Sequence, residues 1–228
     1  MKKNKYICII PARKGSKTLK NKNTKLFNGK PLISWTIEKA IKLSSVEKII
    51  VTSDDPKILE LKKKYNLNKV IFNKRPDELS QDNTRIYEVI KYLHEYYNLK
   101  NSNFILLQPT SPLTRLVDIK KSIKKYEKMN SKFLVSITRN PKTPEFLFEI
   151  NNSSKLVRSK TLKTTNRQLY TKYYEVNGSI YMANFKNFLL EKSFVTTNTH
   201  TYEMDKKYSM DIDDISDFRI AELLTGIK

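Results

Sequence analysis

The sequence predicts one α/β domain built on a mostly parallel sheet that is flanked by helices. Short runs rich in Ile and Val alternate with longer segments whose apolar residues recur at helical spacing. Strands that alternate with helices in this way form βαβ units, whose strands run parallel and are buried on both faces. A chain of 228 residues can bury one substantial core, so a single domain over residues 1–228 is expected.

The elements of this domain follow from the same periodicity. Three helices are predicted, with Pro31 at the first helical position of one and with the others beginning near Ile86 and Leu116. A further strand is expected over 177–184, and a closing helix begins near Ile215. The first strands of the sheet are predicted at residues 6–11, 48–53, 70–73, 103–108 and 132–138.

Residues 140–176 interrupt the alternation and are predicted to form an arm inserted in the domain. The run "FLFEINNSSKLVR" indicates two short strands around a polar turn at Asn151–Ser154. A basic, polar stretch then continues to about Tyr174.

The strong positive charge admits two interpretations. The formal net charge is +21, but only eight of the 44 basic residues are arginine. Because specific nucleic-acid readers favour arginine and gather their charge, lysine used as the default surface residue is the favoured explanation. A basic nucleic-acid-binding module is the alternative, and it predicts steeply salt-dependent binding.

Composition also bears on location. No apolar run approaches the roughly 18 residues needed to span a bilayer. The basic start "MKKNKYICII" has too short an apolar segment for a secretory signal. A cytoplasmic protein is therefore expected. Cys8 is the single cysteine, so no intramolecular disulfide can form.

Four unusual segments are expected at one edge of the sheet. They cover Arg13–Asn23, 75–84, 108–112 and 210–214. In an open α/β sheet, ligands bind beyond the carboxyl ends of the strands, where the first three of these segments begin. The segments therefore predict a shared ligand site.

The first segment is predicted to bind phosphate. Gly15 and Ser16 let backbone N–H groups turn toward a ligand, and the spacing of a P-loop is missing. A solvated basic turn is the alternative. The cations that a triphosphate needs are supplied by Arg13, Lys17, Lys20 and Lys22.

The last segment is predicted to hold Mg²⁺. Asp211 and Asp213 flank Ile212, so on extended backbone both carboxylates face one way. Two hard oxygen ligands plus phosphate oxygens suit this ion. The alternative is that Asp213 or Asp214 caps the helix that follows.

Five ordered motifs resemble those of the CMP-sialic acid synthetases, the acylneuraminate cytidylyltransferases. They extend from residue 9 to beyond 213, and Lys22-Asn23 argues against the related Kdo cytidylyltransferases. The motifs are Pro11-Ala12-Arg13-Lys14-Gly15-Ser16-Lys17 with Lys22-Asn23, Arg75-Pro76-Asp77-Glu78-Leu79, "QPTSPL" at 108–113, "NGSIY" at 177–181 and "DID" at 211–213.

The resemblance implies a Rossmann-like nucleotide-diphospho-sugar transferase fold whose arm makes a homodimer. It implies transfer of CMP from CTP to the anomeric hydroxyl of a nine-carbon 2-keto sugar acid, with Mg²⁺ as cofactor and a role in cell-surface glycan synthesis. Arg13, Gly15, Ser16 and Lys22 would hold the triphosphate, Asn23 and Arg75 would bind the nucleoside, and Asp211 and Asp213 the metal. The sugar site would be lined by Gln108, Arg167, Asn177, Tyr181 and Phe194, with Arg167 meeting the carboxylate.

Two departures from the family pattern lie on the sugar side. The family often has Pro-Leu-Arg where this chain has Leu113-Thr114-Arg115. Glu175 stands just before Val176-Asn177, where sialic-acid-using members have an arginine or a similar residue. N-acetylneuraminate is therefore the first candidate acid, with legionaminic or pseudaminic acid as the alternative.

Overall fold

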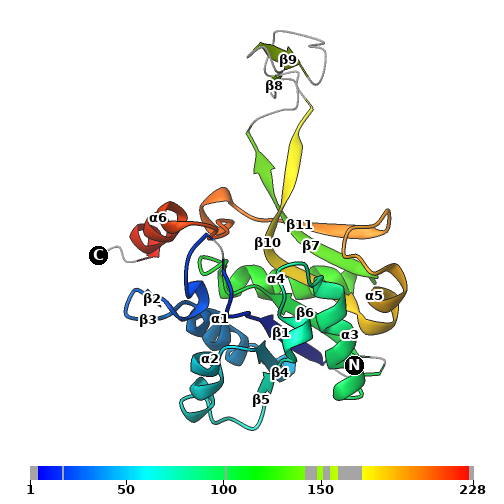
Figure 1. Ribbon diagram of the computed structural model, residues 1–228. Helices are drawn as coiled ribbons and strands as arrows, with labels where there is room; N and C mark the ends of the chain where they lie inside the picture. The colour runs from blue at the N-terminus through cyan, green and yellow to red at the C-terminus, as the bar shows by residue number, and fades with distance from the viewer. Residues whose placement is uncertain are drawn as a thin grey trace.

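A seven-stranded sheet forms the centre of the computed structural model, which describes residues 5–16, 18–100, 102–141, 148–150, 155–158 and 171–225 (Figure 1). The strand order is β11-β7-β10-β6-β1-β4-β5. Within this sheet β10 is antiparallel to both neighbours and every other pair is parallel, which confirms the predicted mostly parallel sheet. The strands are β1 Tyr6–Pro11, β4 Val46–Ser53, β5 Val70–Lys74, β6 Asn103–Leu107, β7 Phe133–Asn140, β10 Tyr173–Asn184 and β11 Thr199–Glu203.

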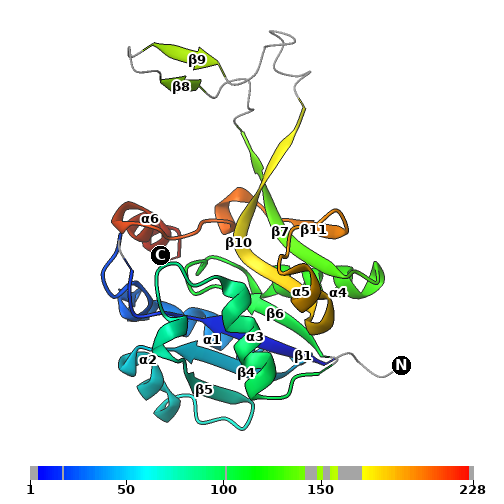
Figure 2. The ribbon, with the colours of Figure 1, turned by 45° about the vertical axis from the view of Figure 1, so that its right-hand side comes forward.

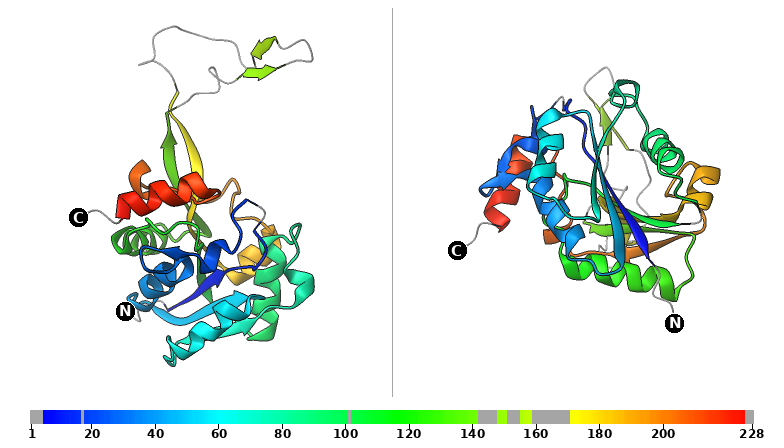
Figure 3. Two further views of the ribbon diagram at one scale, coloured as in Figure 1. Left: turned by 60° about the vertical axis from the view of Figure 1, so that its left-hand side comes forward. Right: turned by 90° about the horizontal axis from the view of Figure 1, so that it is seen from below.

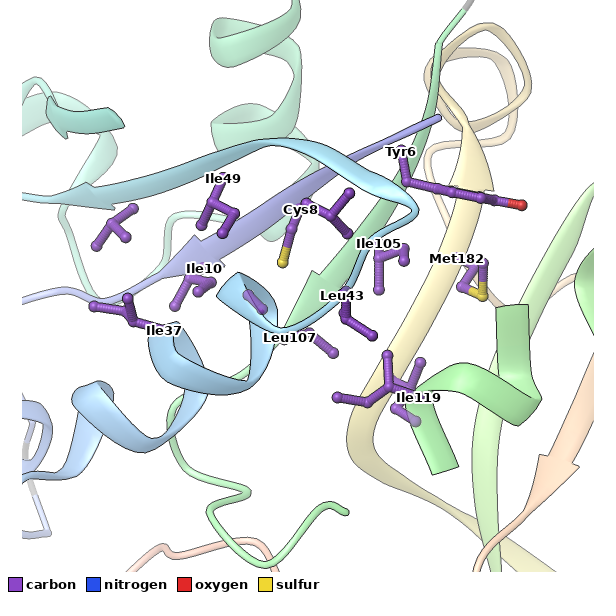
Figure 4. Close-up of a cluster of buried hydrophobic side chains, with 14 of the residues drawn as sticks. Tyr6, Cys8, Ile10, Ile37, Leu43, Ile49, Ile105, Leu107, Ile119 and Met182 are labelled. Atoms are coloured by element: carbon purple, nitrogen blue, oxygen red, sulfur yellow. The ribbon is translucent and has the colours of Figure 1, made fainter. Parts of the chain in front are cut away.

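Helices cover both faces of the sheet, as two views in Figure 3 show. Side chains of α1, α2 and α4 pack on one face, and those of α3 and α5 pack on the other. Successive residues of β1 point to opposite faces. Cys8 and Ile10 belong to the buried cluster that includes side chains of α1 and α4 (Figure 4), whereas Ile7 and Ile9 belong to the cluster that includes side chains of α3 and α5. The helices are α1 Leu32–Ile41, α2 Pro56–Glu60, α3 Ile86–Tyr96, α4 Leu116–Lys128, α5 Phe185–Glu191 and α6 Ile215–Thr225.

A third apolar cluster fastens α6 beside α1. Phe27, from the small hairpin of β2 (Leu26–Phe27) and β3 (Lys30–Pro31), meets Phe218 edge-on with ring centroids 5.4 Å apart. Ile212 is fully buried in the same cluster. Burial of this side chain fixes the backbone that carries the two flanking aspartates.

A bulge interrupts β10 next to β7. Val176 pairs with Ile137 and Tyr181 with Val135, so residues 177–180 of β10 lie opposite Ser136 alone. The Ser136 hydroxyl donates to Asn177 Oδ1 at 2.6 Å and accepts from the Ile180 N–H at 2.8 Å. This hydroxyl takes the place of the missing ladder bonds and holds the bulge open.

The predicted elements are found at nearly the expected residues, except that β10 begins at Tyr173, four residues before the expected start at 177. Helix α1 begins at Leu32, and Pro31 lies just before it in β3 with an extended ψ of 137°. The prediction that placed Pro31 inside the helix was therefore wrong by one residue. The hairpin β2–β3, helix α5 and strand β11 were not predicted, because each is short or lacks a clear periodicity.

Only parts of the arm lie within the described residues. Strands β7 and β10 leave the sheet as a two-stranded ribbon, in which Tyr174 pairs with Arg139 (Figure 2). The two predicted short strands are present as the antiparallel pair β8 (Phe148–Ile150) and β9 (Leu156–Arg158). The predicted turn at Asn151–Ser154 lies outside the described residues. None of the described helices combines the length and hydropathy needed to cross a membrane.

The bulge gives a first testable prediction. Replacing Ser136 by Ala leaves the buried Ile180 N–H without its acceptor, so the variant Ser136→Ala should lose about 1–3 kcal/mol of unfolding free energy. Denaturant unfolding measures this loss. Ser216→Ala, at an exposed position on α6, is the control and should change stability by less than about 0.5 kcal/mol. Equal stability of the two variants would contradict a supporting role for Ser136.

Candidate nucleotide site

A cavity of about 240 Å³ lies beyond the carboxyl ends of β1 and β6. Three of the four predicted segments contribute to its wall, and Lys22 and Thr110 connect it to the fourth. The prediction that these segments share one edge of the sheet is therefore confirmed. The wall consists of Pro11, Arg13, Gly15, Ser16, Lys22, Asn23, Arg75, Gln108, Pro109 and Thr110.

The basic loop after β1 is fastened to the segment at 211–213. The Lys22 side chain is only 12% exposed, and its Nζ donates to the Ile212 carbonyl at 2.7 Å and lies 3.6 Å from Asp213 Oδ1. Thr18 also donates to the Asp213 carbonyl. A solvated turn does not describe Lys22, whose ammonium group is held at the edge of the cavity.

A second cavity of about 620 Å³ adjoins the first and shares Arg13, Gly15 and Ser16 with it. Its other wall is the loop that includes Asp82, whose carboxylate forms an ion pair with Arg13. Lys20 lines this second cavity, whereas Lys17 lies outside the described residues. Arg13 thus lies between the two cavities.

Asn23 and Arg75 present buried polar atoms that have no hydrogen-bond partner in the described part of the chain. Asn23 donates to the Arg13 carbonyl at 3.1 Å, but its Oδ1 is buried and unpaired. Arg75 is 4% exposed, its Nε and one terminal nitrogen make no hydrogen bond, and the nearest carboxylate, that of Asp54, is 3.6 Å away. Burial lowers the pKa of Arg75, and Asp54 opposes this effect. Buried polar groups left unpaired cost free energy, so both residues are prepared for a ligand.

Asp211 lies between the bulge of β10 and the segment after β6. The Ile212 N–H donates to the Thr110 carbonyl at 2.8 Å, and the Thr110 hydroxyl donates to Gln108 Oε1 at 3.3 Å. Gly178 has a φ of +73°, and a Cβ on it would lie 3.2 Å from Asp211 Oδ2. Burial raises the pKa of Asp211, Thr110 opposes this rise, and the charge of Asp213 adds to it. Asp211 Oδ1 is buried and has no hydrogen-bond partner among the described residues.

The helix cap is Asp214, which leaves Asp213 free of that role. Asp214 Oδ1 accepts from the N–H groups of Ser216 and Asp217 at 2.7 and 2.9 Å. The Asp213 side chain is 78% exposed. The described residues contain no cluster of three or more His, Cys, Asp or Glu suited to a metal ion. An ion held by Asp211 and Asp213 would therefore take its remaining ligands from substrate oxygens and water.

The predicted sugar-site residues differ in their surroundings. Gln108 lines the cavity, and the charge of Asp211 together with burial raises the pKa of Tyr181. Phe194 is 6% exposed and packs on Tyr181 with ring centroids 4.9 Å apart. The Asn177 amide is bound by Ser136, by Ser209 at 2.9 Å and by the Met204 sulfur. Arg167 lies outside the described residues.

These contacts define what each sugar-site residue can do directly. Gln108 lines the cavity, and its Oε1 accepts from the Thr110 hydroxyl at 3.3 Å. The polar side-chain atoms of Asn177 form hydrogen bonds inside the protein, which anchor the bulge. Phe194 packs against Tyr181 from the core. The direct sugar contacts predicted for Asn177 and Phe194 stay untested predictions.

Two residues that matter for the geometry were not singled out from the sequence. Thr110 lies in the predicted "QPTSP" segment, but only the structure shows that its carbonyl accepts from the N–H of Ile212, the residue after Asp211. Gly178 is part of the "NGSIY" motif, and its positive φ and its closeness to Asp211 depend on a register that the sequence does not reveal.

The fold and the cavity together define an α/β protein of the nucleotidyltransferase fold, with polar and cationic side chains beyond the carboxyl ends of its strands. Residues 7–224 match the family model described as "Cytidylyltransferase". The chain belongs to this family.

Curated relatives fall into two groups by length. The N-acylneuraminate cytidylyltransferase of Escherichia coli is 36% identical over 96% of this chain, which spans about half (52%) of that relative. The CMP-N,N'-diacetyllegionaminic acid synthase of Legionella pneumophila is 30% identical over 98% of the chain and 97% of the relative. The pseudaminic acid cytidylyltransferase of Campylobacter jejuni is 31% identical, with the same two coverages.

Solved structures agree on the fold. A CMP:2-keto-3-deoxy-manno-octonic acid synthetase complexed with CTP has a TM-score of 0.71 at 16% identity and covers 98% of this chain and 99% of its own. A 4-diphosphocytidyl-2C-methyl-D-erythritol synthase has a TM-score of 0.69 at 11% identity, with coverages of 98% and 100%. These likenesses confirm the Rossmann-like nucleotidyltransferase fold.

The raised pKa of Asp211 gives a second prediction, for the protein without divalent cations. A carboxyl whose pKa is higher in the folded than in the unfolded state stabilises the fold most at low pH, and this contribution is lost as pH rises through the folded pKa. Asp211→Asn removes the buried charge, so at pH 7 the variant should melt at a higher temperature than the wild type. The difference should shrink as pH falls toward 4.

Asp213→Asn is the control for this experiment. Because the Asp213 side chain is largely exposed, its neutralisation removes no buried charge. A lower melting temperature for Asp211→Asn than for the wild type at pH 7 would show that the Asp211 carboxylate supports the fold and does not burden it.

Proposed function

We propose that the chain transfers CMP from CTP to the anomeric hydroxyl of a nine-carbon 2-keto sugar acid and releases pyrophosphate. The observation that carries this proposal is a set of buried polar atoms without hydrogen-bond partners among the described residues. They belong to Asn23 and Arg75 in the wall of one cavity at the strand ends, and to Asp211, whose neighbour Ile212 is bonded to Thr110 of the same wall. Membership of the cytidylyltransferase family supports the same reaction.

The nucleotide would lie across the two adjoining cavities. Arg13 and Lys22, with the backbone N–H groups of Gly15 and Ser16, would bind the triphosphate. Asn23 and Arg75 would bind the nucleoside, because an unpaired amide oxygen and unpaired guanidinium N–H groups complement polar base and ribose edges. Nucleotidyl transfer depends mainly on positioning and charge neutralisation, so no protein nucleophile is needed.

Asp211 and Asp213 fit a divalent cation such as Mg²⁺, because both offer hard oxygens and Asp211 Oδ1 has no hydrogen-bond partner in the described part of the chain. When bound, Mg²⁺ would neutralise charge on the phosphates. Thr110 and Gly178 fix Asp211 on one side, and Lys22 holds the Ile212 carbonyl on the other. The Asp211 carboxylate is thereby kept in place before any ligand arrives, whereas the Asp213 side chain is largely exposed.

The sugar acid would lie beside Gln108 and Tyr181, with Arg167 as the proposed partner of its carboxylate. N-acetylneuraminate is the first candidate, because the N-acylneuraminate cytidylyltransferases have the higher identity among the relatives compared. The relatives that act on legionaminic and pseudaminic acid match this chain in length and keep these acids as the alternative.

We propose further that the arm at 140–176 joins two copies of the chain. The ribbon of β7 and β10 extends away from the sheet (Figure 2). Tyr174 and Val176 on β10 are exposed. We also propose a cytoplasmic enzyme, because CTP is a cytoplasmic metabolite, and a product that a glycosyltransferase consumes to build a surface glycan.

Pyrophosphate release tests the reaction directly. Each of the four NTPs is incubated with Mg²⁺ and with N-acetylneuraminate, legionaminate, pseudaminate or Kdo. We expect release with CTP and one nine-carbon acid, and none with ATP, GTP or UTP. If the folded protein releases no pyrophosphate with any pair, the proposal is wrong, and salt-dependent binding to nucleic acid becomes the hypothesis to test.

A glycine substitution tests how Asp211 is held. Gly178→Ala introduces a Cβ at positive φ and also presses it against Asp211, whereas Gly29→Ala introduces one at a φ of +82° with no heavy atom within 4 Å. Each variant should lose about 1–3 kcal/mol of stability from backbone strain. Only Gly178→Ala should also raise the Mg²⁺ concentration needed for half-maximal pyrophosphate release. The same Mg²⁺ requirement in both variants would contradict the role of the Gly178–Asp211 contact.

A further inference from the structure

Helix α1 carries a cation, Lys39, that contacts the segment at 108–114, part of which lines the cavity. Lys39 donates from its Nζ to the Pro112 carbonyl. It also lines a small internal cavity of about 10 Å³, together with Thr36, Leu107, Gln108, Ser111, Thr114, Ile119 and Ser179. The Lys39 amine is therefore enclosed between α1 and the segment.

Few side chains other than Lys39 form hydrogen bonds with the segment at 108–114 in the described part of the chain. The hydroxyls of Ser111 and Thr114 are buried and make no hydrogen bond in the described part of the chain. Thr36 reaches the Gln108 carbonyl only at 3.5 Å, the outer limit of a hydrogen bond. Arg115, the next cation along the chain, is bound by both oxygens of Asp118 at 2.7 and 3.0 Å. Lys39 thus donates a hydrogen bond to the backbone of the segment, whereas Thr36 lies at the limit of hydrogen-bond distance.

Thr110, in the same segment, is bonded to the backbone next to the proposed metal ligand Asp211. The Thr110 carbonyl accepts from the N–H of Ile212, the residue after Asp211, at 2.8 Å, and the Thr110 side chain lowers the pKa of the Asp211 carboxylate. Ser111 follows Thr110 directly, and Pro112 is the next residue. A shift of the Pro112 carbonyl would therefore move Thr110 and, with it, Asp211.

We propose that Lys39 is a positioning residue, which fixes the segment at 108–114 so that Thr110 can hold Asp211. This inference rests on the proposed function only where activity is the readout. The charged groups that face Lys39 are Lys30 and Glu38, and burial together with Lys30 lowers the pKa of Lys39 to about 7. A neutral amine still donates to the carbonyl, so the contact persists in both protonation states.

The cost of this arrangement supports a positional role. A buried amine is less favourable than an apolar side chain of the same length, so methionine would fill the site at lower cost. A residue that served only packing would gain stability from that replacement. Lys39→Met therefore separates positioning from stability.

The experiment compares Lys39→Met with Lys42→Met, in which the lysine that follows α1 is exposed. Hydrogen exchange of the protein without ligands should show the Ile212 and Ser111 amides of Lys39→Met exchanging about five- to tenfold faster, with an unchanged or higher melting temperature. The kcat should fall by about tenfold or more, and half-saturation by Mg²⁺ should need more of the ion. Lys42→Met should match the wild type in each measurement.

A second variant guards against loss of the fold. Lys39→Gln keeps a shorter donor and should lie between the wild type and Lys39→Met in exchange rate. If Lys39→Met and Lys42→Met exchange equally at Ile212 and need the same Mg²⁺, the proposal is wrong. If the wild type releases no pyrophosphate, the proposed reaction fails, but the exchange comparison still decides the role of Lys39.

Discussion

The close approach of the Asp211 carboxylate to the backbone of β10 is the contact on which the site depends. It is possible because residue 178 has no side chain and because the bulge turns its φ positive. The bulge in turn depends on Ser136, whose hydroxyl replaces the missing ladder bonds. A defect in strand pairing thus brings a carboxylate beside the strand ends, where a ligand can reach it.

The same region accepts energetic costs that a purely structural role would not explain. Asn23 Oδ1, two guanidinium nitrogens of Arg75 and Asp211 Oδ1 are buried without hydrogen-bond partners in the described residues. Each of these groups weakens the fold until a ligand binds. Their gathering around one edge of the sheet is the pattern expected of a preorganised site, in which rigid elements hold polar groups ready for substrate charge. The large apolar core on both faces of the sheet supplies the stability that this arrangement consumes.

The sequence predicted those features that follow from local patterns. Strands such as 6–11 were found because buried parallel strands are continuous apolar runs, and the motif segments were expected to converge because strand ends share an edge. The choice of Asp214 over Asp213 as helix cap could not be made, since both stand next to the helix and only the backbone geometry separates them. The Gly178–Asp211 contact and the burial of Lys39 join residues far apart in the chain, so no local pattern encodes them.

We propose that the Asp211 carboxylate is kept beside β10 in order to bind a divalent cation together with a cytidine triphosphate. Calorimetric titration of CTP into the wild type and into Asp211→Asn, each with and without Mg²⁺, tests it most directly. We expect Mg²⁺ to strengthen CTP binding to the wild type by about tenfold and to have little effect on the variant. Equal strengthening in both proteins would contradict the claim, because the ion would then bind without Asp211.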